Sequence, residues 1–432
     1  MSLRRCAGSA SLAHIFLVAL FLLGWRNIYA EASSELHPKT DTERAVAALI
    51  RRGQTDIVLV QHGRKDHAVG EKPPRPVLSG SFVTELLLLR ANAVPGRLIR
   101  IFGFTIKGEV TMTPDHDPVP FSVSFYSCDF TDKVALAGEF DRNVDFSYVR
   151  LTRGLSLDNV HIKGDLTFSE VSKANVPDFV EINMRKTIVD GTVVFDGFDK
   201  PAPESINGDG LTARSLFFFP APQTVPSIVF SRLRTDDAVF SCDANCAPIE
   251  FLNIEGATIK ENLRFTNFGM KNLHAQGLSV GNRTQIDGSS PIASKLDLTQ
   301  ASLGTFHWEV AERNTRNGQG KTKGVAPSWP ETMTINGIDF SNLSVVPEQH
   351  PRKDARRSAV SNRDLNDQKQ ALSLEFLKQG DFYQPAFVAY QRSLESSGFD
   401  GAANDVNSEM HAKLRHLCCA RYYVAQWFRL GI

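Results

Sequence analysis

Carboxylates at predicted outward positions are the first residues of this chain that could do chemistry. Enzymes that cleave polysaccharides need two carboxylates, or a Ca²⁺ site beside a basic residue, on one face of the protein. The sequence offers Asp145, Asp158 and Asp165. They are spread along the chain, and nothing in their spacing marks a pair. An enzyme is left open, but the sequence leans against it and assigns no catalytic residue.

Two short segments collect residue types that bind metal ions. Asp115–Asp117 reads DHD within TPDHDPVP, and His62, Asp66 and His67 lie within QHGRKDHAVG. Turn-forming neighbours make a solvated turn and an exposed connection the better interpretations. We therefore expect no metal site.

Two glycine-containing motifs match nucleotide-binding patterns on paper. GDGLTA, from Gly208 to Ala213, fits the dinucleotide fingerprint, but SLFFF follows it and predicts a strand where the motif needs a helix. Lys321 and Thr322 end a phosphate-loop pattern, yet Thr315 stands in the place of its first glycine. We expect no cofactor.

Among the 6 cysteines, Cys242 and Cys246 lie close together in VFSCDANCAP. In an oxidising compartment this spacing predicts a disulfide that closes a short loop. Metal binding fits less well, because no histidine and no second cysteine pair accompanies them. Cys128 takes an inward position of the repeat described next and is interpreted as a small core residue.

The elements that must position these residues follow a short repeat, clearest from Val144 to Val171. Its template is apolar-x-apolar-x-x-apolar-x-apolar, and it recurs about every 11 residues. Alternation that stops after two apolar residues predicts short strands separated by corners, so that two units close one four-sided coil. We predict a mainly β fold, a right-handed parallel β-helix (four-sided solenoid). A β-sandwich with short strands is the alternative.

Composition supports a packed core and argues against nucleic acid as a partner. The chain has 432 residues, formal net charge +0, 29 Phe and 7 Tyr. A balanced charge gives no electrostatic footprint for nucleic acid. Stacked Phe rings need no polar partner, which suits a narrow solenoid interior.

The first residues read as a targeting segment. Arg4 and Arg5 precede an apolar run from Ala13 to Trp25, and a small-x-small site follows at residues 30–32. This pattern predicts a signal peptide over residues 1–32, with an uncleaved N-terminal anchor as the alternative. In either case the body is expected to be exported, to the periplasm or the extracellular space, with membrane association left open.

The remaining chain divides into four parts. We predict a helical cap and lead-in over 33–97, the parallel β-helix over 98–345, a charged linker over 346–364 and an α-helical module over 365–432. Asp41 is expected to cap a helix over 42–52, and a second short helix is expected over 81–89. About nine coils, some 45 Å long, are expected. The segment 312–329 is predicted to be a mobile loop, and 398–404 a loop before a third helix that starts near Asn407.

That third helix mixes aromatic and basic residues near the end of the chain. Such a mixture suits the lipid interface or a groove in a protein. The alternative is that the aromatic rings pack back on Phe376 and Tyr390. The residues predicted to contact an envelope protein or a membrane surface are Arg415, Arg421, Tyr422, Tyr423, Trp427 and Phe428.

Three segments carry a resemblance to a known family. VLSGSFVTELLLL with LIRIFGFTIKGEVTM, and later IEGATIKENLRF, resemble bacterial pentapeptide-like right-handed β-helix envelope proteins. FLKQGDFYQPAFVAYQRSLE resembles the helical hairpin that often follows their β-helix, and more loosely a tetratricopeptide unit. The resemblance implies a fold more than a function.

Two functions remain as hypotheses. The first is a non-catalytic exported scaffold or binding protein of the cell envelope, a β-helix stalk with a C-terminal docking module. The second is a carbohydrate-active β-helix enzyme, with a polysaccharide as its partner. Outward aromatic rings beside paired carboxylates would favour the second.

Overall fold

The fold is described from a computed structural model of the chain. It covers residues 36–54, 56–58, 75–89, 98–220, 225–242, 246–287, 290–310, 312–316, 322–347 and 362–430. The predicted signal peptide lies outside these residues, as do His62, Asp66, His67 and residues 348–361 of the predicted linker.

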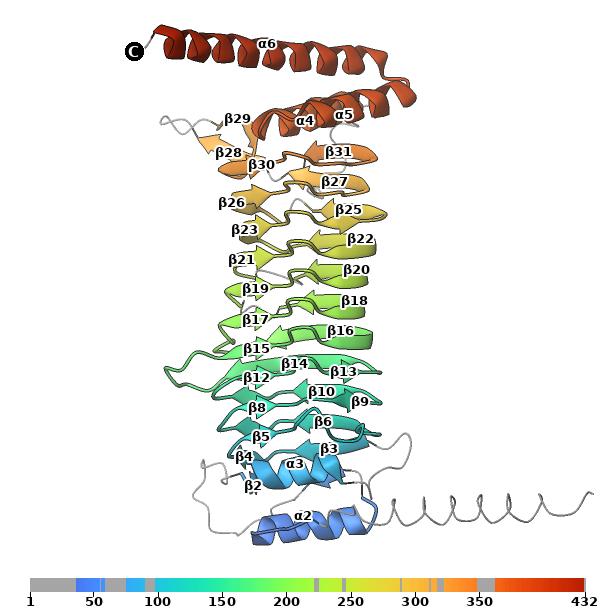
Figure 1. Cartoon of the computed structure of the whole chain (residues 1–432), viewed down its shortest axis with the longest axis vertical. Helices are drawn as coiled ribbons and strands as arrows, with labels where there is room; N and C mark the ends of the chain where they lie inside the picture. Colours follow the sequence, from blue (N-terminus) through green and yellow to red (C-terminus); the bar gives the residue numbers. More distant parts are fainter. Residues whose placement is uncertain are drawn as a thin grey trace, which may run out of the picture.

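Most of the described chain forms a parallel β-solenoid of about nine turns (Figure 1). One turn consists of four short strands: β10 (Val144–Ser147), β11 (Arg150–Leu151), β12 (Leu155–Ser156) and β13 (His161–Ile162). The next turn opens with β14 (Leu166–Lys173), where Leu166 pairs in parallel with Val144. The repeat in the sequence therefore predicted the mainly β fold and its four-stranded turn.

The described strands of the solenoid build two sheets, of 19 and ten strands, and β28 (Glu312–Arg316) pairs with β29 (Thr322–Pro327) in a separate two-stranded sheet. The strands before β10 are β1 (Asp56–Val58), β2 (Val77–Ser79), β3 (Leu98–Phe102), β4 (Thr105–Lys107), β5 (Val110–Thr111), β6 (Ser122–Tyr126), β7 (Asp129–Phe130), β8 (Val134–Ala135) and β9 (Glu139–Phe140). Those after β14 are β15 (Glu181–Asn183), β16 (Ile188–Phe198), β17 (Ser205–Asn207), β18 (Thr212–Phe219), β19 (Ser227–Val229), β20 (Arg234–Ser241), β21 (Ile249–Asn253), β22 (Thr258–Thr266), β23 (Met270–His274), β24 (Ser279–Val280), β25 (Arg283–Ile286), β26 (Ile292–Asp297), β27 (Thr305–Val310), β28 (Glu312–Arg316), β29 (Thr322–Pro327), β30 (Thr332–Thr334) and β31 (Asn342–Pro347).

A column of phenylalanine rings fills the interior. Phe146 stacks on Phe168 with ring centroids 5.6 Å apart, and Phe168 stacks on Phe195 at 4.8 Å. The column continues through residues that share one register, Phe125, Phe218, Phe240 and Phe265. Parallel pairing keeps these positions in register from coil to coil, so the excess of Phe over Tyr matches a column of apolar rings that need no polar partner.

One corner of each coil repeats a left-handed residue. In the middle of the series these are Lys186, Gly210, Arg232 and Gly256, with φ of 54°, 73°, 56° and 63°. The backbone N–H of Lys186 donates to the carbonyl of Asp209, one residue before its counterpart in the next coil. Only glycine adopts this conformation without strain, so the corner explains why glycine recurs at this point of the repeat.

Two helices close the N-terminal end: α2 (Asp41–Arg51) and α3 (Gly80–Leu88). The side chain of Thr40, rather than the predicted Asp41, caps α2 in a capping box with Glu43. The buried Glu43 carboxylate accepts hydrogen bonds from the backbone of Lys39 and Thr40, and from the backbone and hydroxyl of Ser79. Burial alone would raise the pKa of Glu43, but these bonds outweigh it and hold the pKa below its ordinary value.

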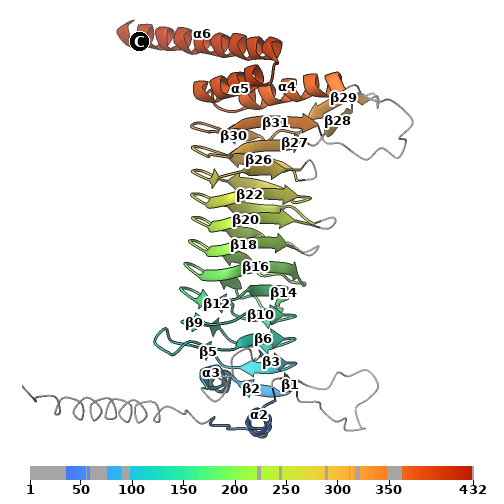
Figure 2. The ribbon, with the colours of Figure 1, turned by 90° about the vertical axis from the view of Figure 1, so that its right-hand side faces the viewer.

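Three helices close the other end (Figure 2). They are α4 (Asn362–Gln379), α5 (Gln384–Ser396) and α6 (Asp400–Leu430). Phe376 of α4 is fully buried against Phe306 and Trp308 of the last coils, with centroids 5.5 and 5.9 Å away. The hydroxyl of Ser373 accepts a hydrogen bond from the backbone N–H of Val345 at 3.0 Å. The cap therefore covers both the apolar interior and an edge strand of the final turn.

Three expectations need correction. The predicted loop at 398–404 is helical from Asp400 onward, since α6 begins there and runs for 31 residues. The predicted mobile loop at 312–329 contains an antiparallel hairpin of β28 and β29. Two short strands, β1 and β2, join the sheet ahead of the predicted start at Leu98. In the described part of the chain, no helix combines the length and apolarity that a bilayer crossing requires.

Candidate functional site

The three outward carboxylates singled out in the sequence are not brought together as a pair. Asp145 accepts hydrogen bonds from the hydroxyls of Ser124 and Ser147, at 2.6 and 2.7 Å. Asp158 pairs with the guanidinium of Arg185 at 3.1 Å and also accepts from the backbone N–H of Arg185.

Asp165 has partners of its own and accepts from the backbone N–H of Thr192 at 2.8 Å. Each of the three carboxylates thus links its own coil to a neighbouring coil.

The segments that resemble metal and nucleotide motifs have structural roles in the described part of the chain. The ring of His116 lies within hydrogen-bond distance of the carbonyls of Asp117 and Ala137, at 2.6 and 2.9 Å, and so fixes its own turn. The strand β18 follows the GDGLTA motif, as the sequence indicated. Within the described residues, no group of three or more His, Cys, Asp or Glu side chains could hold a metal ion.

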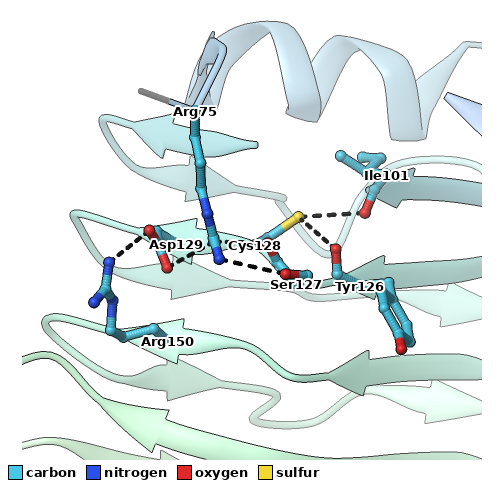
Figure 3. A network of polar contacts seen from close by, with 7 residues as sticks. All are labelled: Arg75, Ile101, Tyr126, Ser127, Cys128, Asp129 and Arg150. Atoms are coloured by element: carbon cyan, nitrogen blue, oxygen red, sulfur yellow. Dashed lines mark hydrogen bonds and ion pairs between the residues drawn. The ribbon is translucent and has the colours of Figure 1, made fainter. Parts of the chain in front are cut away.

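A cluster that the sequence analysis missed lies near the N-terminal end of the solenoid (Figure 3). Asp129 is held between two arginines, with Arg75 at 2.9 Å and Arg150 at 2.6 Å. Arg75 also donates to the carbonyl of Ser127 at 2.7 Å. Asp129 and Arg150 occupy one register position in successive coils, which the spacing of 21 residues could have revealed. Arg75 comes from outside the repeat and carries no such signal.

Cys128 directly precedes Asp129 in the chain and is buried beneath this cluster. Its thiol is buried and donates to the carbonyls of Ile101 and Tyr126, at 3.2 and 3.5 Å. Burial raises the pKa of Cys128 to about 11. A thiol with so high a pKa is a poor nucleophile at neutral pH, which agrees with the structural role expected for it.

Outward aromatic rings form a second feature absent from the sequence analysis. Phe102 and Tyr126 stack with centroids 5.2 Å apart, and Tyr148 lies 5.2 Å beyond Tyr126. Phe102 is 38% and Tyr148 53% exposed. We call these three residues the aromatic column. Tyr126 of the column and the arginine-flanked Asp129 lie on two sides of one corner of the coil, with Ser127 and Cys128 between them (Figure 3).

The predicted C-terminal contact residues all lie on α6. Arg415 is exposed on the surface of this helix. Arg421, Tyr422, Tyr423, Trp427 and Phe428 belong to its last turns, where the structure describes the backbone but not the side chains. Side-chain exposure rises along the helix, from 6% at Met410 to 45% at Leu417. Beyond that point α6 runs past α4 and α5 (Figure 1).

A hollow of about 410 Å³ opens between the three C-terminal helices. Its polar lining comes from Asp367, Gln370 and Asp405, and its apolar lining from residues that include Leu374 and Val406. The hollow lies beside the first turns of α6, where this helix packs against α4 and α5.

The two cysteines of the predicted loop are joined in the structure. Cys242 and Cys246 form a disulfide at the end of β20, with Cα atoms 6.2 Å apart.

Comparison with known proteins identifies no relative: no family model, no curated protein and no solved structure matches this chain.

Proposed function

We propose that this protein is a non-catalytic, exported scaffold of the cell envelope, a rigid β-solenoid stalk that docks through its C-terminal helix. The proposal includes an N-terminal signal over residues 1–32. It also includes the resemblance to pentapeptide-like β-helix envelope proteins that carry a helical hairpin. The single observation that carries it is the course of α6 beyond the helices that cap the solenoid (Figure 1).

The cap itself needs only part of α6. Ala403, Val406 and Met410 are buried in the first turns and hold α6 against the other helices. The exposed Leu417 marks where this contact ends. A helix rises about 1.5 Å per residue, so the turns after Leu417 extend about 20 Å further. That length has no part in covering the solenoid.

The composition of those turns matches an anionic lipid surface. Asp400, Asp405 and Glu409 precede residue 411, and the chain from 411 to 432 contains no Asp or Glu. The same stretch carries Lys413, Arg415, Arg421 and Arg429 together with the aromatic residues of the predicted contact set. Aromatic rings favour the level of the lipid head groups, and basic side chains favour anionic lipids.

Deletion of residues 418–432 tests the docking role. We expect the shortened chain to melt like the full chain, to lose binding to vesicles of mixed anionic and zwitterionic lipids, and to leave the envelope fraction. Purely zwitterionic vesicles serve as the control. Release from the envelope fraction with unchanged vesicle binding would assign the helix to a protein groove instead. Unchanged fractionation and unchanged vesicle binding would overturn the proposal.

One observation favours the second function, action on a polysaccharide. The aromatic column is exposed on an outward face, and Asp129 and Asp145 lie on the same coils. Both carboxylates are already engaged by neighbouring side chains. An assay for released reducing ends on soluble glucans and chitin oligosaccharides tests this function, and a sustained rate above the Asp129→Asn variant would support it.

A further inference from the structure

The aromatic column has a conformational cost at its most exposed ring. Tyr148 adopts φ of 54°, in the left-handed region, where a bulky side chain is an outlier. The equivalent corners of other coils hold Gly103, Ser127, Glu170 and Gly197, also with positive φ. A left-handed backbone strains any residue other than glycine, and the solenoid repeats this conformation at the same corner of neighbouring coils. A tyrosine at this corner therefore exposes an aromatic ring at a position that favours glycine.

Polar groups flank the column on both sides. On the same sheet face, Asp145 is held by the hydroxyls of Ser124 and Ser147, and Ser147 pairs with Tyr126 across the strands. Around the corner, Asp129 lies between its two arginines (Figure 3).

The charges of four groups beside the column cancel, and Arg100 adds one positive charge on the same sheet face as Asp145. Two aspartates, Asp129 and Asp145, stand against Arg75 and Arg150. Arg150 is 54% exposed on its side chain and directs only one terminal nitrogen to Asp129. Its other N–H groups can donate to a ligand, and the two carboxylates retain lone pairs that can accept from hydroxyl groups. A surface with aromatic rings, nearly balanced charge and many donors and acceptors suits a neutral, hydroxyl-rich ligand.

The spacing of the column adds a second constraint. Its rings repeat every 5.2 Å because each belongs to a successive coil, whose strands lie about 4.8 Å apart. A periodic surface fits a periodic ligand, and the repeat is close to the length of one sugar in an extended chain. We propose that the aromatic column with Asp129, Asp145, Arg75 and Arg150 binds a neutral linear glycan of β-1,4-linked hexopyranoses.

Titration calorimetry with three hexasaccharides tests the glycan site in the full chain. The probes are β-1,4-linked glucose, mannose and N-acetylglucosamine, used up to millimolar concentration. We expect at least one to bind, and we expect Tyr148→Ala to weaken that binding about tenfold or more, as aromatic anchors do. Phe179→Ala is the matched control, because Phe179 is 64% exposed and lies outside the column. It should bind like the unchanged chain.

A second variant separates binding from folding. Tyr148→Gly removes the ring and suits the left-handed backbone, so it should fold at least as stably as Tyr148→Ala and still lose affinity. Failure of all three sugars to bind would overturn the proposal. Equal affinity of the Tyr148 variants and the unchanged chain would do so as well. Failure of the sugars, with loss of a cross-linked envelope protein from Tyr148→Ala alone, would reassign the surface to a protein partner.

Discussion

The indole nitrogen of Trp329 donates a hydrogen bond of 2.9 Å to the carboxylate of Glu375. Trp329 precedes the last coil, and Glu375 lies on α4, so this bond joins the solenoid to its C-terminal cap. The ring of Trp329 also packs edge-on against Trp308 at 5.5 Å. The junction is thus an aromatic cluster with a polar bond at its rim.

Truncation of Phe376 should open this junction. Phe376 is fully buried among Phe306, Trp308 and Trp329, so Phe376→Ala should cost about 3–5 kcal/mol of unfolding free energy. An uncovered last coil should also self-associate. Urea unfolding and light scattering measure the two effects. The control Phe399→Ala removes a ring that is 38% exposed and should change stability far less. Equal losses would mean that the cap does not depend on the cluster.

The register of the coil predicts opposite effects at two adjacent residues. Leu157 is fully buried, so Leu157→Asp places an unpaired carboxylate in the core and should cost several kcal/mol. Asp158→Ala loses an outward ion pair and a hydrogen bond to Arg185, about 1 kcal/mol. Truncation of an outward residue without a partner would change the unfolding free energy very little, so the contacts to Arg185 account for the loss expected here. Thermal melts of both variants check it, and similar melting temperatures would contradict the register.

The left-handed corner predicts a matched pair of substitutions. Gly256→Ala should lower stability by about 1 kcal/mol through backbone strain alone, since a Cβ there meets only Arg232 at 3.6 Å. Lys186→Gly at the equivalent corner should raise stability by about 0.5 kcal/mol, because relief of strain exceeds the added freedom of the unfolded chain. Chemical unfolding of the two variants measures this. A loss of stability in both would indicate that side-chain contacts, not φ, determine the residue here.

Stability should fall at mildly acidic pH because of His307. Burial lowers the pKa of His307; Glu309 opposes this shift, and Arg283 and Lys369 reinforce it. Neutral His307 therefore stabilises the fold fully above the ordinary histidine pKa of about 6.5. This stabilisation is lost as the pH falls from about 6.5 through the lowered pKa that His307 has in the folded state.

Urea midpoints between about pH 7.5 and pH 5 would measure this loss. His307→Gln should flatten the slope that linkage predicts over this range. The exposed His411→Gln serves as the control and should keep the slope of the unchanged chain.

The fold was predictable because the solenoid repeats a local rule. Inward residues such as Phe146 and Leu157 stand at fixed intervals, and corners such as Gly210 and Gly256 punctuate them. Each coil contacts only its neighbours, so short-range pattern determines most of the architecture.

The features missed from the sequence arise between coils or between separate segments. Arg75 reaches Asp129 across 54 residues, and no periodicity connects them. In the aromatic column, Phe102 and Tyr126 share a register position, but Tyr148 lies one residue further along its strand, so the three rings do not follow one template position. The start of α6 was missed because glycines 398 and 401 suggested a loop, and burial of Ala403 and Val406 against the cap outweighs that local preference.

Because the solenoid is built from four-stranded turns, its length can change in steps of one turn. Because Val144 lies over Leu166, excision of one whole period would rejoin strands that already share a register and would leave both caps unaltered. The rod would shorten by one rung, about 4.8 Å, and each outer face would keep its orientation. Excision of half a period would instead rotate every later face to the opposite side. Loss of a whole period would thus change the length of the rod alone, and loss of half a period would change the direction in which its later faces point.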